Sequence, residues 1–262
     1  MIEKWLVEQD PEQVSAVLDI QVVTADETVD EDTLYDYLGH ELLRNYVVPG
    51  ELEMIFRDLG VPEVADHLAN HKFPTLDSIR TGDFGEAMSG ALFRRARRWC
   101  VPILKLRYKQ RPNQPVQGAD FLGFRLRQSP PVVAVPEVKT RTDKRLNVGV
   151  EASTSLDHVL EELPSSVEFV VARLLEQHSA LAPRVAQLLD EGYTVERHIV
   201  LVHDDGQWDD RISERLAAAE DEPTQLTVIR LANLKNIIDK SFAEAALAPR
   251  RLADREAGTS DA

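Results

Sequence analysis

The chain has 262 residues, 43% of them hydrophobic, and a formal net charge of −15 from 30 Lys and Arg against 45 Asp and Glu. This length and apolar content suffice for one large or two small domains. A single cysteine excludes an internal disulfide and a Cys-rich metal site. The first residues lack the layout of a signal peptide, and no apolar run approaches the ~18 residues that a membrane helix needs. We therefore expect a soluble, cytoplasmic protein with no membrane partner.

The first third of the chain is predicted to be acidic and mainly helical, with one strand. We expect an N-terminal extension over residues 1–76. Its predicted elements are a helix beginning near Asp10, a strand over 17–23, a helix over 26–46 and short helices over 51–59 and 61–69. A longer helix over 77–100 follows and ends before Pro102.

The centre of the chain is predicted to be rich in strands. Basic residues alternate over 105–111, as on one side of a strand, and a partly alternating run over 120–127 is separated by a Pro-containing turn from the apolar run 132–135. If the second and third runs pair as a hairpin, Asp120 lies roughly opposite Lys139. Glu137 shares a side of its strand with Lys139, because residues two apart face the same way.

The last third is predicted to alternate helices and strands. The expected elements are helices over 156–163 and 166–189, a strand over 198–203, a helix over 207–219, a strand over 225–231 and a helix over 234–242. The polar residues 248–262 are expected to be a disordered tail. The fold class is thus α/β, with a core over residues 77–247.

Asp120, Glu137 and Lys139 are the residue types that a metal-dependent nuclease requires. Phosphodiester hydrolysis needs a hard cation, which stabilises developing charge and activates water, and hard cations prefer carboxylate oxygens. Asp120 and Glu137 are the candidate ligands of Mg²⁺ or Mn²⁺, and Lys139 is placed to orient the attacking water.

Each candidate also has a purely structural interpretation. Asp120 follows Gly118 and is a suitable residue for a turn that begins a strand. Glu137 and Lys139 would form an exposed ion pair on an edge strand. Glu86 stands three residues after Asp83, so the two form an Asp version of the capping box at a helix start.

Positive charge is concentrated around these candidates. Residues 94–145 contain 14 basic and 3 acidic residues, in a chain that is acidic elsewhere. A phosphate backbone requires such a local field, although a solvated basic face is the alternative. The candidate DNA-binding residues are Lys105, Arg107, Lys109, Arg111, Arg141 and Lys144.

The ordered motifs resemble the PD-(D/E)xK nuclease superfamily and, more closely, the nuclease subunit of Hachiman-type anti-phage systems. The matching stretches are Gly85–Glu86 at a helix, Lys105–Lys109, Pro115–Asp120 and Glu137–Lys139, and the likeness is good over 78–145 and loose outside it. Pro136 departs from the pattern, because it removes a ladder donor and suggests an exposed edge or a bulge.

The resemblance implies a restriction-endonuclease-like core, which has a mixed central sheet flanked by helices, and Glu86 as a further metal ligand. It also implies a helicase or ATPase partner, and the chain itself has no P-loop motif for a motor. The prediction is a metal-dependent DNA endonuclease with little sequence specificity, acting in anti-phage defence. The alternatives are a non-catalytic nucleic-acid-binding or regulatory subunit on the same fold, and a nuclease that acts on RNA.

Overall fold

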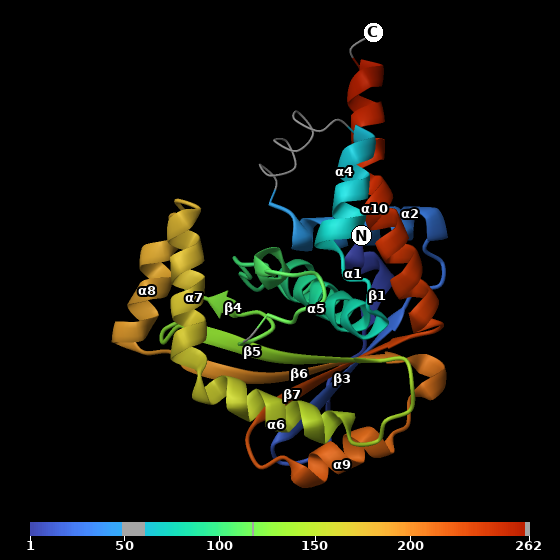
Figure 1. Cartoon of the computed structure of the whole chain (residues 1–262). Helices are drawn as coiled ribbons and strands as arrows, with labels where there is room; N and C mark the ends of the chain where they lie inside the picture. Colours follow the sequence, from blue (N-terminus) through green and yellow to red (C-terminus); the bar gives the residue numbers. More distant parts are fainter. Residues whose placement is uncertain (49–60, 117, 260–262) are drawn as a thin grey trace.

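The computed structural model of the chain describes residues 1–48, 61–116 and 118–259. Its centre is one mixed sheet, in the order β1-β3-β7-β6-β5-β4 with β2 beside β3 (Figure 1). Strands β3, β7, β6 and β5 run parallel to one another, whereas β1, β2 and β4 are antiparallel to their partners. The strands are β1 (Leu6–Glu8), β2 (Glu12–Gln13), β3 (Leu18–Ala25), β4 (Gly123–Arg125), β5 (Val132–Arg141), β6 (Thr194–Asp204) and β7 (Thr224–Leu231). This arrangement confirms the predicted α/β class with a mixed sheet flanked by helices.

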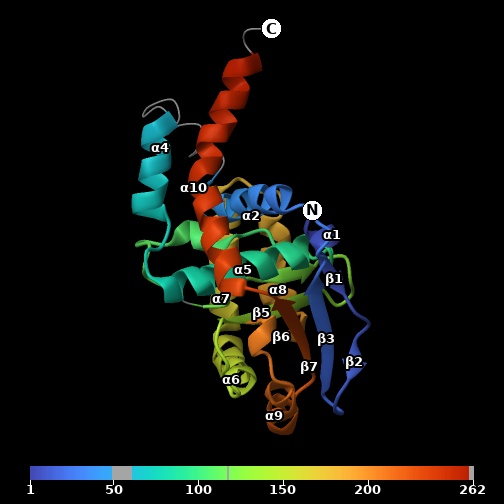
Figure 2. The ribbon, with the colours of Figure 1, turned by 90° about the vertical axis from the view of Figure 1, so that its right-hand side faces the viewer.

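Helices cover both faces of the sheet and divide the core into two apolar layers. One layer includes α1 (Ile2–Trp5), α2 (Glu31–Tyr46), α4 (Val61–His67), α5 (Asp77–Arg95) and α10 (Leu234–Thr259), and the other α6 (Val148–Glu161), α7 (Leu163–Glu176), α8 (Ala182–Glu191) and α9 (Arg211–Ala219). Figures 1 and 2 show α2 and α5 on one side of the sheet and α6 and α9 on the other. Among the described helices, none combines the length and apolar character needed to cross a membrane.

The N-terminal region, predicted over 1–76 as a mainly helical extension, contributes strands to this sheet. β3 pairs in parallel with β7 along its length, and β1 pairs with β3 on the outer side (Figure 2). The helix expected near Asp10 is instead the short strand β2. The partner β7 lies near the other end of the chain, so no local pattern could reveal this pairing. The helix expected over 51–59 lies outside the described residues.

Two other differences concern helices. The single helix expected over 166–189 is α7 and α8, because His178 has a left-handed φ of 51° and Pro183 opens the second helix. The tail expected to be disordered continues α10 as far as Thr259. Its Ala, Leu, Arg and Glu residues are strong helix formers, which explains the continuation past Pro249.

Strand β5 carries the predicted site, and β4 covers only its first part. The pairing runs from Arg125 opposite Val132 to Gly123 opposite Ala134, so the strand predicted over 120–127 is shorter than expected. Beyond Ala134, β5 is paired only with β6 among the described residues. One edge of β5 is therefore free of strand pairing where Glu137 and Lys139 lie.

Candidate nuclease site

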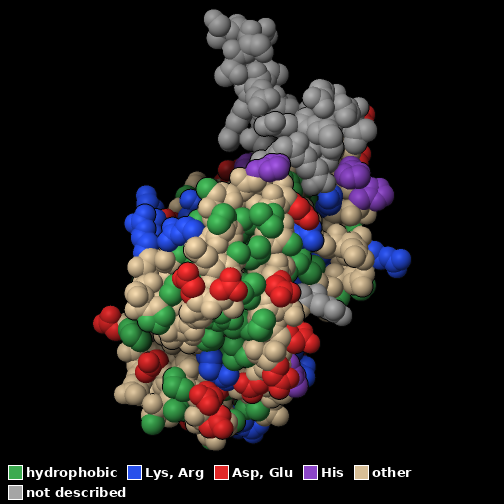
Figure 3. All heavy atoms as spheres, turned by 90° about the vertical axis from the view of Figure 1, so that its left-hand side faces the viewer, with side chains coloured by type: hydrophobic (Ala, Val, Ile, Leu, Met, Phe, Trp, Pro, Cys, Tyr) green, Lys and Arg blue, Asp and Glu red, His purple; other side chains and the backbone are tan. Residues whose placement is uncertain are grey.

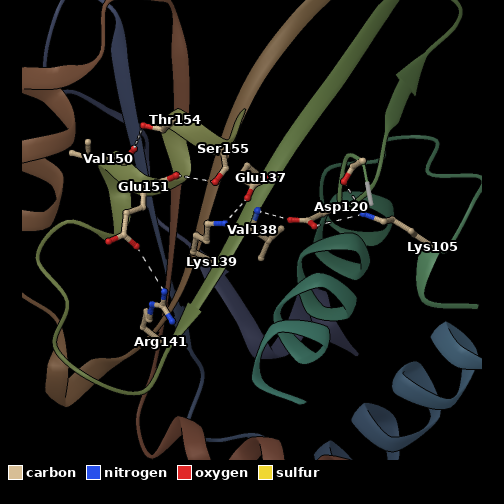
Figure 4. Close-up of polar contacts among 11 residues, drawn as sticks. Lys105, Asp120, Glu137, Val138, Lys139, Arg141, Val150, Glu151, Thr154 and Ser155 are labelled. Atoms are coloured by element: carbon tan, nitrogen blue, oxygen red, sulfur yellow. Dashed lines mark hydrogen bonds and ion pairs between the residues drawn. The ribbon is translucent and has the colours of Figure 1, made fainter. Parts of the chain in front are cut away.

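Asp120 closes the free edge of β5. It lies just before β4, and its Oδ2 accepts a hydrogen bond of 2.8 Å from the backbone N–H of Val138 (Figure 4). The hairpin thus brings Asp120 beside the Glu137–Lys139 segment, as its sequence predicted. Because Asp120 accepts this hydrogen bond from an edge N–H, it holds the segment before β4 in fixed register with the Glu137–Lys139 segment of β5.

Pro136 fits this edge. Successive residues of a strand direct their N–H groups to opposite sides, so Pro136 faces the same side as Val138. That side is the free edge, where a missing N–H costs no ladder hydrogen bond. The edge at Pro136 is therefore free of strand pairing, but it is not exposed as expected, because Pro136 is buried and Asp120 occupies the adjacent position.

Glu137 and Lys139 lie on one side of β5, as predicted. Lys139 Nζ lies 2.7 Å from Glu137 Oε1 (Figure 4). Glu137 is only 7% exposed, so the pair is not the solvated edge ion pair of the structural interpretation. Burial raises the pKa of Glu137, the charge of Asp120 raises it further, and Lys139 partly opposes both.

Helix α5, which carries Glu86, packs on the face of β5 opposite to Glu137 and Lys139, and the charge of Asp120 acts on the Glu86 carboxyl group. This helix begins at Asp77 with Leu76 as its N-cap, so the capping-box interpretation of Asp83 and Glu86 is wrong. Gly85 lets the helix approach β5 closely, because a Cβ there would lie 1.8 Å from Thr140 Oγ1. Without that approach, Glu86 could not lie beside the strand.

The carboxyl group of Glu86 receives no hydrogen bond from any residue that the structure describes. Burial raises its pKa well above the ordinary value, and the charge of Asp120 adds to this, whereas Lys105 opposes it. Glu86 is half-buried, and beside the charge of Asp120 its ionised form is unfavourable unless a proton or a cation compensates it. Glu86 is therefore the least satisfied group of the site.

Lys105 is an internal residue and not part of a basic strand. Residues Lys105–Tyr108 form a 3₁₀ turn, and Lys105 is 6% exposed. Its Nζ donates hydrogen bonds of 2.8 Å to the carbonyl oxygens of Gly118 and Ala119 and lies 4.0 Å from Asp120 Oδ1. The stem of the lysine is buried while its ammonium group neutralises the carboxylates of the site.

The other predicted DNA-binding residues divide into internal and surface groups. Lys109 forms a buried ion pair with Asp83, which also accepts a hydrogen bond from Tyr46, and Arg107 donates to the carbonyl of Arg44. The strand that was to align these side chains on one surface is absent from the described residues 105–111. Arg111 and Lys144 are exposed and Arg141 is half-buried; Arg141 lies 3.8 Å from Glu151, and Lys144 lies 2.6 Å from Asp209.

A hollow of about 470 Å³ opens beside Lys139. Its walls come from the end of β5, from the first turns of α5 and from α10, which contributes Lys235. Lys235 lies 3.6 Å from Asp77 across the hollow. The hollow leaves Lys139 open to solvent.

Lys235 belongs to no motif that sequence reasoning could recognise, whereas Asp83 could have been found from its position three residues before Glu86 on one helix face.

The donor chemistry of the site suits a hard divalent cation, because Glu86, Asp120 and Glu137 offer only carboxylate oxygens. Glu137 uses one oxygen with Lys139, whereas Asp120 accepts from Val138 with Oδ2 and faces Lys105 with Oδ1. Among residues 1–48, 61–116 and 118–259, no three His, Cys, Asp or Glu side chains stand close enough to form a ready-made cage. A cation would thus be held by carboxylates that reorient, and the orphaned Glu86 is the group with most to gain.

One comparison with known proteins identifies the family of the chain. The sequence matches the HamA family over residues 1–245, nearly its whole length. No curated protein matches it. The family match spans the site residues of α5, the hairpin and β5 together with the N-terminal strands. The chain therefore belongs to the HamA family, whose members are proteins of the multi-subunit Hachiman anti-phage defence systems.

Proposed function

We propose that this protein is the nuclease of its defence system, a Mg²⁺- or Mn²⁺-dependent enzyme that hydrolyses DNA phosphodiester bonds with little sequence specificity. The observation that supports this most is the position of Asp120 at the free edge of β5, where its charge acts on both Glu86 and Glu137, and Lys139 pairs with Glu137. Three separate segments supply these groups, and burial raises the pKa of two of the carboxyl groups. Such shifts are common at functional sites.

In this proposal the residues have distinct tasks. Asp120 and Glu137 would hold the cation, and Glu86 would complete or support the site. When bound, the cation supplies charge stabilisation and lowers the pKa of a water molecule. Lys139 reaches the open hollow, where its ammonium group orients the attacking water and faces the phosphate. Arg141, Arg111 and Lys144 contribute positive charge along the DNA backbone.

Control by a partner ATPase is part of the same proposal. The net charge of −15 repels polyanions except where a basic surface faces them. The chain also lacks a P-loop, so any ATP-driven movement along DNA must come from another subunit. A helicase subunit that delivers DNA would meet both requirements.

The first experiment is metal-dependent cleavage of supercoiled plasmid. The full chain, alone and with its system's ATPase subunit, is incubated with Mg²⁺ or Mn²⁺ beside Lys139→Ala. The matched control is Lys4→Ala, which removes one exposed lysine of α1. We expect nicking by the parent and the control, and none by Lys139→Ala. Nicking that survives in Lys139→Ala would refute the assignment of the site, and parallel RNA substrates test the preference for DNA.

A second candidate, a non-catalytic nucleic-acid-binding subunit, is favoured by one observation. The carboxylates of the site form no ready-made three-ligand cage among the described residues. Binding of Mg²⁺ to the full chain, measured by calorimetry beside Asp120→Asn, separates the two functions. Metal binding that depends on Asp120 supports the nuclease, whereas nucleic-acid binding without metal binding or cleavage in the complex supports the alternative.

A further inference from the structure

A second basic surface lies away from Lys139, at the other end of β4. It is a hollow of about 530 Å³ between β4, the turn that follows α5 and the helix α8. Four arginines line it, and no acidic residue is among the described residues of its lining. We call this hollow the arginine groove, and its basic residues are Arg98, Arg125, Arg127 and Arg184.

The fold brings these arginines together from three segments. Cys100 pairs with Phe124 through two backbone hydrogen bonds of 2.8 and 3.2 Å, which extends the sheet by one bridge and places Arg98 beside β4. Arg184 of α8 donates a hydrogen bond of 3.1 Å to the carbonyl of Leu126. The segment of Arg98 is thus held by backbone hydrogen bonds to β4, and α8 is held by a hydrogen bond to Leu126, the residue that follows β4. The groove is a built feature and not a chance meeting of long side chains.

The charges of the groove are mostly uncompensated. Arg98 and Arg127 are exposed, and neither side chain forms a hydrogen bond or ion pair with any described residue. Arg98 also holds a left-handed φ of 58°, which is uncommon for a residue other than glycine. Arg125 is fixed differently, because its guanidinium lies 3.9 Å from the ring centre of Trp99 and 3.8 Å from Glu196. Two free guanidinium groups thus flank one that is held in place.

Such a cluster is unusual in a chain with net charge −15. Figure 3 faces the side of the molecule on which α7 and α8 lie, and there basic side chains gather at one edge while acidic ones are scattered over the rest. Like charges that gather without carboxylate partners repel one another, so their assembly favours a polyanionic ligand. Arginine forks fit phosphate oxygens in particular. The floor of the groove is apolar, formed by Phe124, Leu126 and Leu181.

We propose that the arginine groove binds the phosphodiester backbone of the nucleic-acid strand whose cleavage is proposed above. β4 and the residues on either side of it connect the arginine groove with Asp120 at the proposed nuclease site. Five positions separate Asp120 from Arg125, which corresponds to at most about 17 Å of extended chain. This distance matches about five base-pair steps of a duplex. A duplex held in the groove is therefore long enough to span the distance to Asp120. The groove deepens the proposed function and rests on it for the identity of the ligand.

The test measures binding without cleavage. Fluorescence anisotropy of a labelled 20-base-pair duplex is recorded in EDTA over a range of KCl concentrations, with the full chain and the double variant Arg98→Gln/Arg127→Gln. Neither arginine side chain has an internal partner among the described residues, so the fold should persist, which thermal unfolding verifies. The control Lys4→Gln/Lys240→Gln removes two exposed charges from α1 and α10; because Lys240 lies 3.5 Å from Glu31, its thermal unfolding is measured as well.

Each phosphate contact contributes about 0.9 to the slope of log K against log salt concentration on duplex DNA. We expect the slope of the double variant to be smaller than that of the parent by about 1–2, whereas the control keeps the parental slope. Equal slopes for variant and control, or a parent that binds no DNA, would overturn the groove. Because EDTA excludes cleavage, a change of slope supports the groove even if Lys139→Ala shows that the nuclease proposal fails. If the parent cleaves DNA but the slopes of log K against log salt concentration are unchanged, the proposal for the arginine groove is refuted and the nuclease proposal stands.

Discussion

Replacing Gly85 by alanine tests the close approach of α5 to β5, on which the position of Glu86 depends. A Cβ at residue 85 would lie 1.8 Å from Thr140 Oγ1, 3.1 Å from Thr140 Cβ and 3.4 Å from Val138 Cγ1. Rotation of Thr140 can move Oγ1 away but not its Cβ, so the helix or the strand must also shift. Overpacking of this kind costs about 1–3 kcal/mol. For a chain of this size that cost corresponds to a fall in Tm of roughly 2–10 °C.

The same helix offers a matched control. A Cβ at Gly82 meets no atom within 4 Å, so Gly82→Ala changes only helix propensity. That substitution should stabilise the protein by up to about 1 kcal/mol. Differential scanning calorimetry gives the Tm of both variants. It compares an alanine Cβ that meets Thr140 with one that meets no atom, on the same helix. Equal Tm values would refute the close approach.

A double-mutant cycle identifies the neighbour. Thr140→Ala removes the oxygen that a Cβ at residue 85 would strike, so Gly85→Ala/Thr140→Ala should recover part of the lost stability, with a coupling of about 1 kcal/mol or more. Strictly additive effects would show that Gly85→Ala acts elsewhere. Because Glu86 is adjacent, we also expect Gly85→Ala to weaken any Mg²⁺-induced rise in Tm, which Gly82→Ala should leave intact.

Two further predictions concern the charges of the site. The raised pKa of Glu86 means that the native state keeps a proton above pH 4.5, where the unfolded chain releases it, so this residue lowers stability as the pH rises from 4.5 through the folded pKa. Glu86→Gln should therefore raise Tm at pH 8 and have little effect near pH 4.5, and a Tm difference that is independent of pH would contradict this. Lys105→Met leaves the carbonyls of Gly118 and Ala119 without their donor, so we expect a loss of about 2–3 kcal/mol in urea unfolding, with an unchanged salt slope for DNA binding. A smaller salt slope in Lys105→Met would instead restore this lysine to the DNA-binding surface.

The hairpin was predictable because its information is local. Asp120, the turn and the Glu137–Lys139 pair lie in one short stretch of sequence, and the two-residue period of a strand determines which side chains share a face. The burial of Glu137 was not predictable, since it depends on helices from distant parts of the sequence. The same holds for β3, whose partner β7 follows only near the end of the chain.

Predictions from local sequence patterns were wrong where the same pattern fits two different local structures. Asp83 and Glu86 have the spacing of a capping box, yet the helix begins earlier, at Asp77. The alternation of basic and apolar residues from Lys105 to Lys109 suggested a strand, although so short a window cannot separate a strand from a turn. Burial of Leu106 and of the Lys105 stem decided for the turn, because the ammonium group finds two carbonyl oxygens inside.

Concentrated positive charge in the sequence thus serves two purposes in the structure. Three site carboxylates have a lysine nearby, and the pairs are Asp83 with Lys109, Glu137 with Lys139 and, at 4.0 Å, Asp120 with Lys105. Basic residues that stay on the surface, such as Arg98 and Arg127, are available to a polyanion.

The fourth carboxylate, Glu86, forms no ion pair with a described residue, and its pKa is raised by burial and by the charge of Asp120. A cluster with four carboxylates and three lysines lacks one positive charge when all are ionised. A proton supplies that charge in the free protein at low pH. At neutral pH a divalent cation could take its place, so metal binding and deprotonation of Glu86 are thermodynamically coupled. The Mg²⁺-induced rise in Tm should accordingly grow from pH 5 to pH 8 in the parent and not in Glu86→Gln. An equal, pH-independent rise in both would show that the cation binds without Glu86.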